Sequence, residues 1–453
     1  MKNLIPHLIP LILILPGLLH SQNIKDQKLS VTVYNNNLGV VKDSRNLSLK
    51  SGVSEIKISD VAKLIDPTSV HIKLDGEVIE QNYQYDLVSL DKILHKYIDR
   101  KISLVNENNE LLEGTLLSAF GGQIVLQQDD GGLLMIPSVN KYRFNVGALP
   151  EGLITKPTLV WKVNSPSSKG QDIEITYQTQ GMNWHAEYVA LLNDDDTELD
   201  LNSWVSVTNN SGTTYKDAKL KLIAGDVNRV QDARPLYKGR GELESMAMQA
   251  DAQQFEEKEF FEYHIYNLQR PTTLAQNETK QISLFDAQDV DANKKYFYRS
   301  TGYNSRGKVN VIVEFANKEN QNLGVPMPKG KVRVYKSDGE SVEFIGEDLI
   351  DHTPKNETVK LKIGDAFDIL AEEKQVDHKK ITNRVYEQTH EIKITNRKNE
   401  NIVVEVERFL GLNWNVLESS IDFEKKNAQT ISFKVPVKKD DETTLTFKVR
   451  YSN

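Results

Sequence analysis

Two short clusters in the sequence combine side chains that could take part in binding or chemistry. In the first, Trp184, His185 and Glu187 lie within four residues of one another. If this piece is a strand, His185 and Glu187 project from the same face, because side chains alternate with a period of two. The three residues form the most chemically varied cluster of the chain and are predicted as exploratory binding residues. The competing interpretation gives them a structural role, with the tryptophan covering the edge or the core of a β-sandwich.

The second cluster follows the dipeptide Ala224-Gly225 and consists of Asp226, Asn228 and Arg229. Acidic and basic side chains two or three residues apart at the end of a strand can form an exposed ion pair, which contributes little stability. They can instead line a polar pocket. These three residues are therefore also predicted as exploratory binding residues, with the same structural alternative beside them.

Two further motifs begin like known ligand-binding loops but are incomplete. Residues 302–308 match the first part of a phosphate-binding loop, yet Val309 stands where Ser or Thr would hold magnesium. The segment that follows alternates like a strand, so a hairpin turn is predicted instead. Residues 289–300 begin like an EF-hand, but Lys294 and Ser300 replace the glycine and the glutamate that the calcium loop needs.

The acidic run Asp194–Asp196, with Glu198 and Asp200 nearby, could bind calcium, but a solvated turn is the preferred interpretation. The sequence contains no HExxH pair and no GxSxG elbow. No catalytic residue, metal ligand or cofactor is predicted. A pair of catalytic carboxylates stays open, because such a pair is defined by its separation in space and not in sequence.

The composition excludes several classes of protein. The chain has 453 residues, with 64 Asp and Glu, 56 Lys and Arg, a net charge of −8 and no cysteine. Disulfide frameworks, thiolate catalysis and zinc sites built on cysteine are therefore excluded. The acidic balance also disfavours nucleic acid as a partner, because contacts to phosphate need clustered Lys and Arg.

Residues 1–21 have the layout of a secretory signal peptide. Lys2 supplies a positive charge, an apolar region follows, and the small residue Ser21 offers a cleavage position. A membrane anchor is the alternative, but the apolar stretch from Leu4 to Leu19 contains three prolines and a histidine, whereas a spanning helix needs ~20 apolar residues. No later stretch approaches a membrane span, so no transmembrane segment is expected in the cleaved chain.

Most of the remaining chain alternates between apolar and polar residues, and turn residues recur about every 8–12 positions. This pattern predicts a mainly β protein built of several antiparallel β-sandwich domains. Residues 22–86 are predicted to form an N-terminal β-domain. Residues 87–146 are predicted to form a small separate unit, with a helix capped by Ser89 and about five short strands. This order resembles the small Sm-like and SH3-like barrels.

Residues 157–370 are predicted to form a central β-sandwich region, interrupted at 230–258 by a mobile loop in which apolar residues become sparse. The many short strands of residues 380–453 are typical of an immunoglobulin-like sandwich, although this one has no cysteine pair. Thr-Asn pairs at 208–209 and 395–396 both stand at strand ends. They predict that the two regions use the same turn chemistry.

Several sequence segments of the central and C-terminal regions resemble those of a known protein family. They are residues 177–188 (YQTQGMNWHAEY), 204–212 (WVSVTNNSG) and 217–229 (DAKLKLIAGDVNR), followed by 261–266, 271–274, 280–285 and 364–368. Together they resemble a bacterial family of unknown function that includes mucoidy-inhibitor-like proteins, over about residues 160–453. The resemblance implies β-rich domains and secretion by Gram-negative bacteria, and it supplies no catalytic residues. The inserted unit at 87–146 departs from many members.

The signal segment, the β architecture and the lack of a complete catalytic motif lead to one main hypothesis. The protein is expected to be exported by a Gram-negative bacterium to the periplasm, the outer surface or the exterior. It would be a non-enzymatic binding or structural protein of the envelope whose partner is a protein or a polysaccharide. The alternatives are a hydrolase that acts on envelope glycan or peptide through unidentified carboxylates, and a calcium-stabilised adhesive module. The ligand and the oligomeric state are not specified by the sequence.

Overall fold

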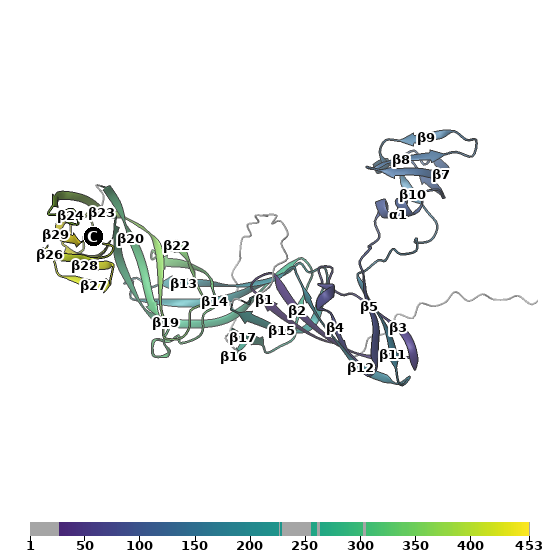
Figure 1. Ribbon diagram of the computed structural model, residues 1–453, viewed down its shortest axis with the longest axis horizontal. Helices are drawn as coiled ribbons and strands as arrows, with labels where there is room; N and C mark the ends of the chain where they lie inside the picture. Colours follow the sequence, from purple (N-terminus) through teal and green to yellow (C-terminus); the bar gives the residue numbers. More distant parts are fainter. Residues whose placement is uncertain (1–26, 226, 229–254, 261–262, 302–304, 453) are drawn as a thin grey trace, which may run out of the picture.

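The computed structural model describes residues 27–225, 227–228, 255–260, 263–301 and 305–452. In this part of the chain the protein is mainly β, with several largely antiparallel sheets, none of which closes into a barrel. Figure 1 shows the sheets following one another along an elongated molecule, with the C-terminus at one end. The predicted mainly β, multi-sheet organisation is therefore confirmed.

Two sheets at the N-terminal end share one hydrophobic core. The larger has, in spatial order, β16 (Phe255–Phe260), β17 (Tyr263–Leu268), β15 (Tyr215–Ala224), β1 (Lys28–Tyr34), β2 (Leu38–Ser48), β12 (Gly170–Thr179) and β4 (His71–Lys73), while β18 (Thr272–Leu274) pairs with β15. The smaller has β3 (Gly52–Ser59), β11 (Thr158–Ser165) and β5 (Glu77–Gln84). Strands from the range predicted as an N-terminal domain thus pair with strands from the range predicted as central. An alternating pattern sets which face is buried, but it does not name the neighbouring strand.

The small unit over residues 87–146 contains the predicted helix and five strands. They are α1 (Leu90–Lys96), β6 (Lys101–Val105), β7 (Leu111–Phe120), β8 (Gln123–Gln127), β9 (Leu133–Ile136) and β10 (Arg143–Asn145). The side chain of Ser89 accepts a hydrogen bond from the backbone of Lys92, which confirms the predicted cap. The sheet runs β10-β6-β7-β8-β9. The helix and five strands are therefore present in the predicted order, but the sheet stays open and does not close into a barrel. Closure would need a ladder between the two shortest strands, β9 and β10.

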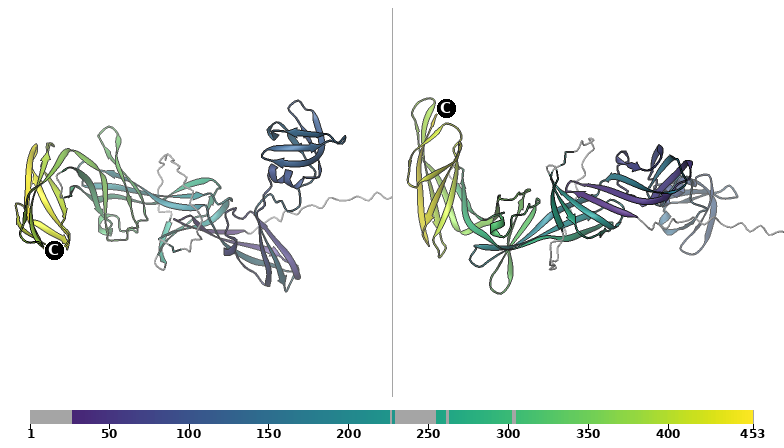
Figure 2. Two further views of the ribbon diagram at one scale, coloured as in Figure 1. Left: turned by 45° about the horizontal axis from the view of Figure 1, so that its top comes forward. Right: turned by 90° about the horizontal axis from the view of Figure 1, so that it is seen from below.

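Figures 1 and 2 show this unit standing apart from the other sheets. Its own core contains Leu94, Leu104, Leu116 and Leu126, all of which are buried. The unit therefore has a core of its own and is inserted between β5 and β11 of the N-terminal sheets.

Three short 3-10 helices, η1 (Pro67–Ser69), η2 (Val139–Lys141) and η3 (Glu319–Gln321), lie in connections between strands.

The rest of the chain forms one 13-stranded sheet. Its spatial order is β22 (Val342–Ile350), β21 (Gly330–Ser337), β13 (Met182–Leu192), β14 (Glu198–Asn209), β19 (Glu278–Ser300), β20 (Ser305–Ala316), β23 (Thr358–Lys380), β24 (Val385–Asn396), β29 (Asp441–Ser452) and β26 (Trp414–Ser419). Off this path, β25 (Ile402–Phe409) pairs with β19 and β28 (Thr430–Val437), and β27 (Phe423–Asn427) pairs with β28. At the edge, the backbone N–H of Lys362 in β23 donates to a side-chain oxygen of Asp348 in β22 at 2.7 Å. The sheet therefore curls around its core.

The core of the N-terminal sheets also extends under β13, β14 and β21 of the 13-stranded sheet, and we call it the central core. A second core, the C-terminal core, lies between β24, β25, β28 and β29. Three long strands pass from the central core into the C-terminal core. In β19, for example, Val290 packs in the first core, whereas Tyr296 and Tyr298 pack in the second. β20 and β23 are divided between the two cores in the same way. The C-terminal core therefore includes residues well before position 380. An alternating pattern continues unchanged through such a transition, so the sequence does not mark it.

The inner face of the C-terminal core becomes polar at one end. Ser300, Glu373 and Arg408 end the buried rows of β19, β23 and β25, and Arg408 Nη1 lies 3.3 Å from both Ser300 Oγ and Glu373 Oε1. His390 of β24 is fully buried and stacks on Phe447. Neither of its ring nitrogens has a hydrogen-bond partner among the described residues. Burial, reinforced by the charge of Arg408, lowers the pKa of His390 to about 4.

Candidate functional site

A pocket of about 220 Å³ lies where the end of β15 meets the two loops that flank β21 and β22. Its lining comes from the end of β15 and the next residue (Ala224, Gly225), from β17 (His264, Tyr266) and from the two loops (Pro326, Met327, Pro328, His352, Thr353, Pro354). β15 and β17 belong to the N-terminal sheet, whereas β21 and β22 belong to the 13-stranded sheet. Boundaries between domains are common places for ligand pockets. We call this site the proline-walled pocket.

The wall of the pocket is held firmly by backbone hydrogen bonds. Met327 and Thr353 exchange two of them, each 2.9 Å long, so the two loops form a short bridge. The flanking prolines fix φ and offer no N–H. Their carbonyl oxygens are bound from two sheets, because Tyr266 donates to Pro326 at 2.9 Å and Tyr188 donates to Pro328 at 2.7 Å. The loops are therefore positioned before any ligand arrives.

Tyr266 is the most deeply buried polar group of the lining. Burial raises the pKa of its phenol above the ordinary range, with the negative charge of Glu257 adding to the effect. The hydroxyl therefore stays protonated and acts as a hydrogen-bond donor. It is committed to the loop carbonyl of Pro326, so its role at the site is to fix the wall.

Two imidazoles supply the main ligand-facing polar groups of the pocket. His264 Nδ1 lies 2.7 Å from Glu257 Oε1. His352 Nδ1 accepts a hydrogen bond from the backbone N–H of Lys329 at 3.2 Å, and its Nε2 lies 3.4 Å from the amide nitrogen of Asn35. The pocket thus combines an apolar wall with a few oriented polar groups, which is typical of sites for small ligands.

Trp184 lies behind this pocket and not on the surface. It is 1% exposed, its Nε1 donates to the carbonyl oxygen of Ile223 at 3.1 Å, and its ring meets Tyr266 edge-on at 6.2 Å. Tyr266 and Ala224, the neighbour of Ile223, both line the pocket. Trp184 is therefore a core residue that positions two parts of the lining.

His185 and Glu187 project from the opposite face of β13. As expected for a strand, they lie side by side, with His185 Nε2 3.3 Å from Glu187 Oε1. The hydrogen bond with His185 lowers the pKa of Glu187, against the opposing effect of partial burial. Gln281 Nε2 donates to Glu187 Oε2 at 3.0 Å. The structure therefore divides the first cluster between a buried face and an exposed face.

The second cluster, Asp226, Asn228 and Arg229, directly follows Gly225, which lines the pocket. Gly225 has a φ of 137°, and a Cβ at this position would lie 2.3 Å from the ring of Tyr263. Glycine is therefore needed where the chain leaves β15. Asn228 is exposed, while Asp226 and Arg229 lie outside the described residues. Most of the predicted loop at 230–258 lies outside them too, although β16 begins at Phe255.

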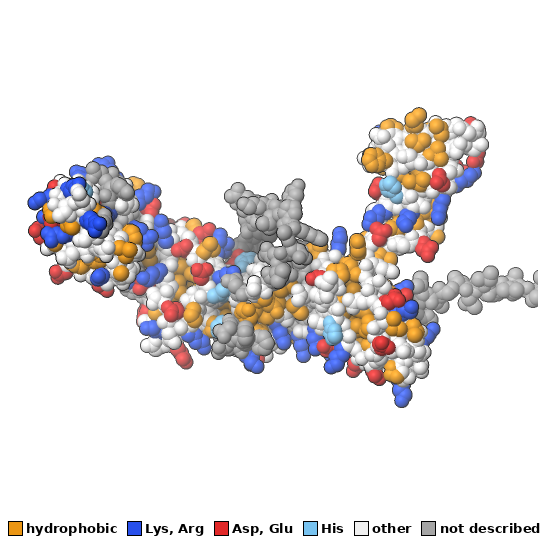
Figure 3. Space-filling view, viewed as in Figure 1, with side chains coloured by type: hydrophobic (Ala, Val, Ile, Leu, Met, Phe, Trp, Pro, Cys, Tyr) orange, Lys and Arg blue, Asp and Glu red, His pale blue; other side chains and the backbone are white. Residues whose placement is uncertain are grey.

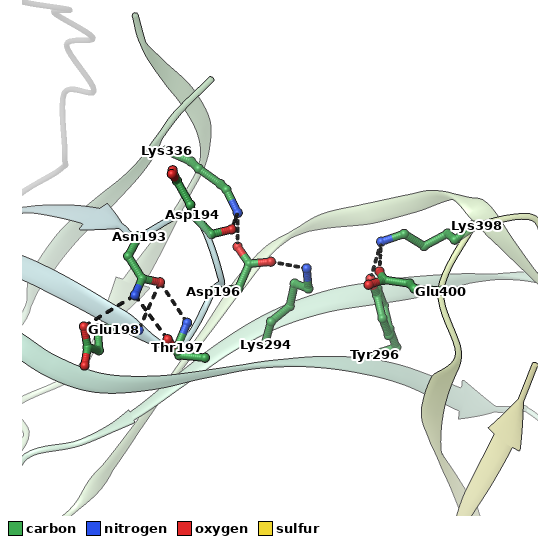
Figure 4. A network of polar contacts seen from close by, with 10 residues as sticks. All are labelled: Asn193, Asp194, Asp196, Thr197, Glu198, Lys294, Tyr296, Lys336, Lys398 and Glu400. Atoms are coloured by element: carbon green, nitrogen blue, oxygen red, sulfur yellow. Dashed lines mark hydrogen bonds and ion pairs between the residues drawn. The ribbon is translucent and has the colours of Figure 1, made fainter. Parts of the chain in front are cut away.

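The acidic run at 194–196 forms the turn between β13 and β14. The side-chain oxygen of Asn193 accepts hydrogen bonds from the backbone N–H groups of Thr197 and Glu198, at 2.9 and 3.2 Å. Asp196 lies between the ammonium groups of Lys294 and Lys336, as Figure 4 shows. Partial burial alone would raise the pKa of Asp196, but the two lysines outweigh it and lower the pKa. The carboxylate is therefore already neutralised by lysine.

The other ligand-like motifs also lie in ordinary strands. Residues 289–300 belong to β19, so they do not form a calcium loop. β20 begins at Ser305 and contains Gly307 and Lys308, while residues 302–304 lie outside the described part. Across the described ranges, no group of three or more His, Asp or Glu side chains is placed to hold a metal ion.

Residues 173–452, more than half of the chain, match the family model described as a domain of unknown function (DUF4139), so the chain belongs to this family. This confirms the resemblance to a family of unknown function. No curated protein is similar enough to this chain to be matched. The match begins within β12 and ends within β29. It therefore includes every strand and loop that lines the proline-walled pocket.

The two histidines of the pocket, His264 and His352, were not among the residues predicted from the sequence. The available signal was the pair of proline-flanked segments, Pro326–Pro328 and His352–Pro354. Their spacing along the chain does not show that they bridge to each other.

Figure 3 shows hydrophobic side chains gathered on the middle of the molecule, over the region of β15 and β17.

Proposed function

We propose that the protein is an exported envelope protein with a non-enzymatic binding role, and that the proline-walled pocket holds part of its protein or glycan partner. The pocket carries this proposal. Tyrosine hydrogen bonds fix the loop before β21, and the Met327–Thr353 bridge ties the loop after β22 to it. The described lining contains imidazole, phenol and hydroxyl groups but no carboxylate. A rigid, mostly apolar lining with few polar groups is suited to recognition.

Export is supported by the signal-like segment at residues 1–21, which lies outside the described part of the chain. For an exported chain, the absence of cysteine favours a bacterial envelope over a eukaryotic secretory route. The resemblance to mucoidy-inhibitor-like proteins favours a Gram-negative envelope. Within the described residues, none of the helices has the length and hydrophobicity needed to cross a lipid bilayer. The location proposed is the periplasm, the outer surface or the exterior.

Hydrolysis of an envelope polymer is the second candidate, and one hollow favours it. An open hollow of about 450 Å³ beside the β13–β14 turn is lined by several carboxylates, among them Asp195, Glu198 and Asp289. These three side chains are exposed, whereas a general acid needs a site that disfavours its charged form. Binding is therefore the better-supported function.

The test uses the chain from residue 22 onward, immobilised and exposed to envelope extracts. His264→Ala removes an imidazole from the pocket, and His185→Ala is the matched control because His185 is also an accessible histidine beside a glutamate. We expect wild type and H185A to retain the same protein or polysaccharide and H264A to retain clearly less. Recovery of nothing by wild type, or equal recovery by both variants, would overturn the proposal.

A further inference from the structure

A second hollow lies on the outer face of the long sheet, where β19 leaves the central core. It has a volume of about 330 Å³. Phe297 of β19 and Ile312 of β20 give it an apolar floor. Phe297 lies at the fork where β19 has β20 on one side and β25 on the other, and it is paired with Asn310 and Glu405. We call this hollow the fork groove.

Charged side chains of both signs surround this floor, and they form ion pairs with one another. Lys295 and Lys360 lie 3.0 and 3.7 Å from Glu314. On the other side, Arg299 lies 3.3 Å from Glu407. The groove therefore has no strong field of one sign along this part of its rim, and neither a polyanion nor a polycation is selected by charge.

The third carboxylate of the rim is held in the same way. Glu405 lies 3.5 Å from Lys426 and accepts a hydrogen bond of 3.2 Å from the hydroxyl of Ser432. In total the rim has four cationic and three anionic groups, all ion-paired within it. Glu424, beside the rim and 3.4 Å from Lys426, balances the fourth cation. Such groups can still donate hydrogen bonds to an uncharged partner or accept hydrogen bonds from it, since each keeps part of its surface open to solvent.

An extended peptide is a poor fit to this groove. β19 is paired on both sides at the fork, with β20 and with β25, so its backbone offers no free edge to an added strand. Strand addition depends on such an edge for its main-chain hydrogen bonds. The volume lies at the lower end of the ~300–1,000 Å³ range of ligand pockets, which favours a small unit.

From these observations we infer that the fork groove binds a neutral polysaccharide, with one sugar ring against Phe297 and its hydroxyl groups on the charged rim. The rim includes the guanidinium of Arg299, which lies over the Phe297 ring at 5.7 Å from its centroid. A pyranose ring presents an apolar face of C–H groups surrounded by hydroxyl groups. The groove has the complementary arrangement, with an aromatic floor and a rim of charged donors and acceptors. This inference rests on Phe297 and its neighbours, and it does not depend on the proline-walled pocket.

The test is affinity electrophoresis of the chain from residue 22 onward, in gels that contain a soluble glucan, mannan or galactan, or heparin as an anionic control. At least one neutral polysaccharide should retard wild type, and added salt should leave the retardation unchanged. Phe297→Ala should weaken binding about tenfold or more, whereas Phe297→Trp should preserve it. The matched control is Phe367→Ala, because Phe367 is 93% exposed on β23 outside the groove.

Arg299→Ala provides a second variant that does not disturb a core, since this side chain is 72% exposed. It should weaken binding several-fold without changing the melting temperature. The inference is overturned if no neutral polysaccharide retards wild type, or if only heparin does so in a salt-sensitive manner. Equal retardation of F297A, F367A and wild type would also overturn it. Loss of binding in F297A with retention in H264A separates this groove from the proline-walled pocket.

Discussion

The indole nitrogen of Trp184 donates a hydrogen bond of 3.1 Å to the backbone carbonyl oxygen of Ile223. This contact joins β13 of the 13-stranded sheet to β15 of the N-terminal sheet. It belongs to a single continuous core that extends over both sheets. The tryptophan that marked the most varied cluster in the sequence therefore stabilises the boundary between two sheets.

Replacing Trp184 by Phe should lower the free energy of unfolding by about 2 kcal/mol. The change removes the donor to a buried carbonyl and leaves a small cavity. Urea unfolding followed by circular dichroism measures it. Trp414→Phe is the matched control, because Trp414 also donates to a backbone carbonyl, that of Ala428, but in an exposed setting. Its loss should stay below about 1 kcal/mol, and equal losses would contradict the role assigned to Trp184.

The buried pair of Arg408 and Glu373 should be far more sensitive than a surface pair. Arg408→Met leaves the carboxylate of Glu373 buried without its cation, which should cost about 3–5 kcal/mol of unfolding free energy. Lys331→Met removes the cation of an exposed pair, 2.9 Å from Glu347, and should cost less than about 1 kcal/mol. Urea midpoints compare the two. Similar midpoints would show that the C-terminal core does not depend on the charge of Arg408.

His390 should make the C-terminal core sensitive to acid. Its pKa is about 4 in the folded chain, against about 6.5 for an unperturbed histidine. Between these values the unfolded state binds more protons, so stability is complete above about pH 6.5 and falls as the pH drops towards 4. His390→Phe should reduce this loss, measured as the difference in urea midpoint between about pH 7.5 and about pH 5.

The same substitution should not lower stability near neutral pH. Both ring nitrogens of His390 lack partners among the described residues, and an aromatic ring can keep the stacking on Phe447. Replacing an unpaired polar group by an apolar group of similar shape is nearly neutral or stabilising. A variant with an unchanged acid response would show that other groups govern it.

Calcium should not stabilise the protein. Asp196, at the centre of the acidic turn, is occupied by Lys294 and Lys336. Calcium would have to displace two ammonium groups from the carboxylate before binding. The melting temperature should therefore be the same in excess calcium and in excess chelator. Asp196→Asn should lower it in both conditions, and a chelator-dependent shift in wild type would restore the calcium hypothesis.

Local features were predictable because they depend on neighbours in the chain. The alternation of apolar and polar residues gave the strands and their buried faces, and Ser89 marked the start of α1. The two Thr-Asn pairs also form the same turn. In each, the side chain of Asn209 or Asn396 donates to the carbonyl four residues ahead and accepts from the N–H two residues ahead. These turn hydrogen bonds depend only on residues that are close together in the sequence, so they can be predicted from it.

The remaining features depend on partners far away in the sequence. β1 runs parallel to β15, about 190 positions later, and no local pattern specifies such a neighbour. The proline-walled pocket needs β15, β17 and two loops at once. The fork groove needs β19 to change its neighbour from β14 to β25 along its length. For the same reason, the face of Trp184 was predictable, whereas the hydrogen bond to Ile223 was not.

The three strands that cross from the central core to the C-terminal core also have a mechanical consequence. β19 and β23 are each 23 residues long, and Figure 2 shows these strands running from one part of the molecule into the next. Tension along the long axis would have no slack linker to extend at this junction. It would load the ladders between β19, β20 and β23 directly. The two cores would thus resist tension together, as one mechanical unit. The small unit over residues 87–146 is attached at the side and is not part of this path.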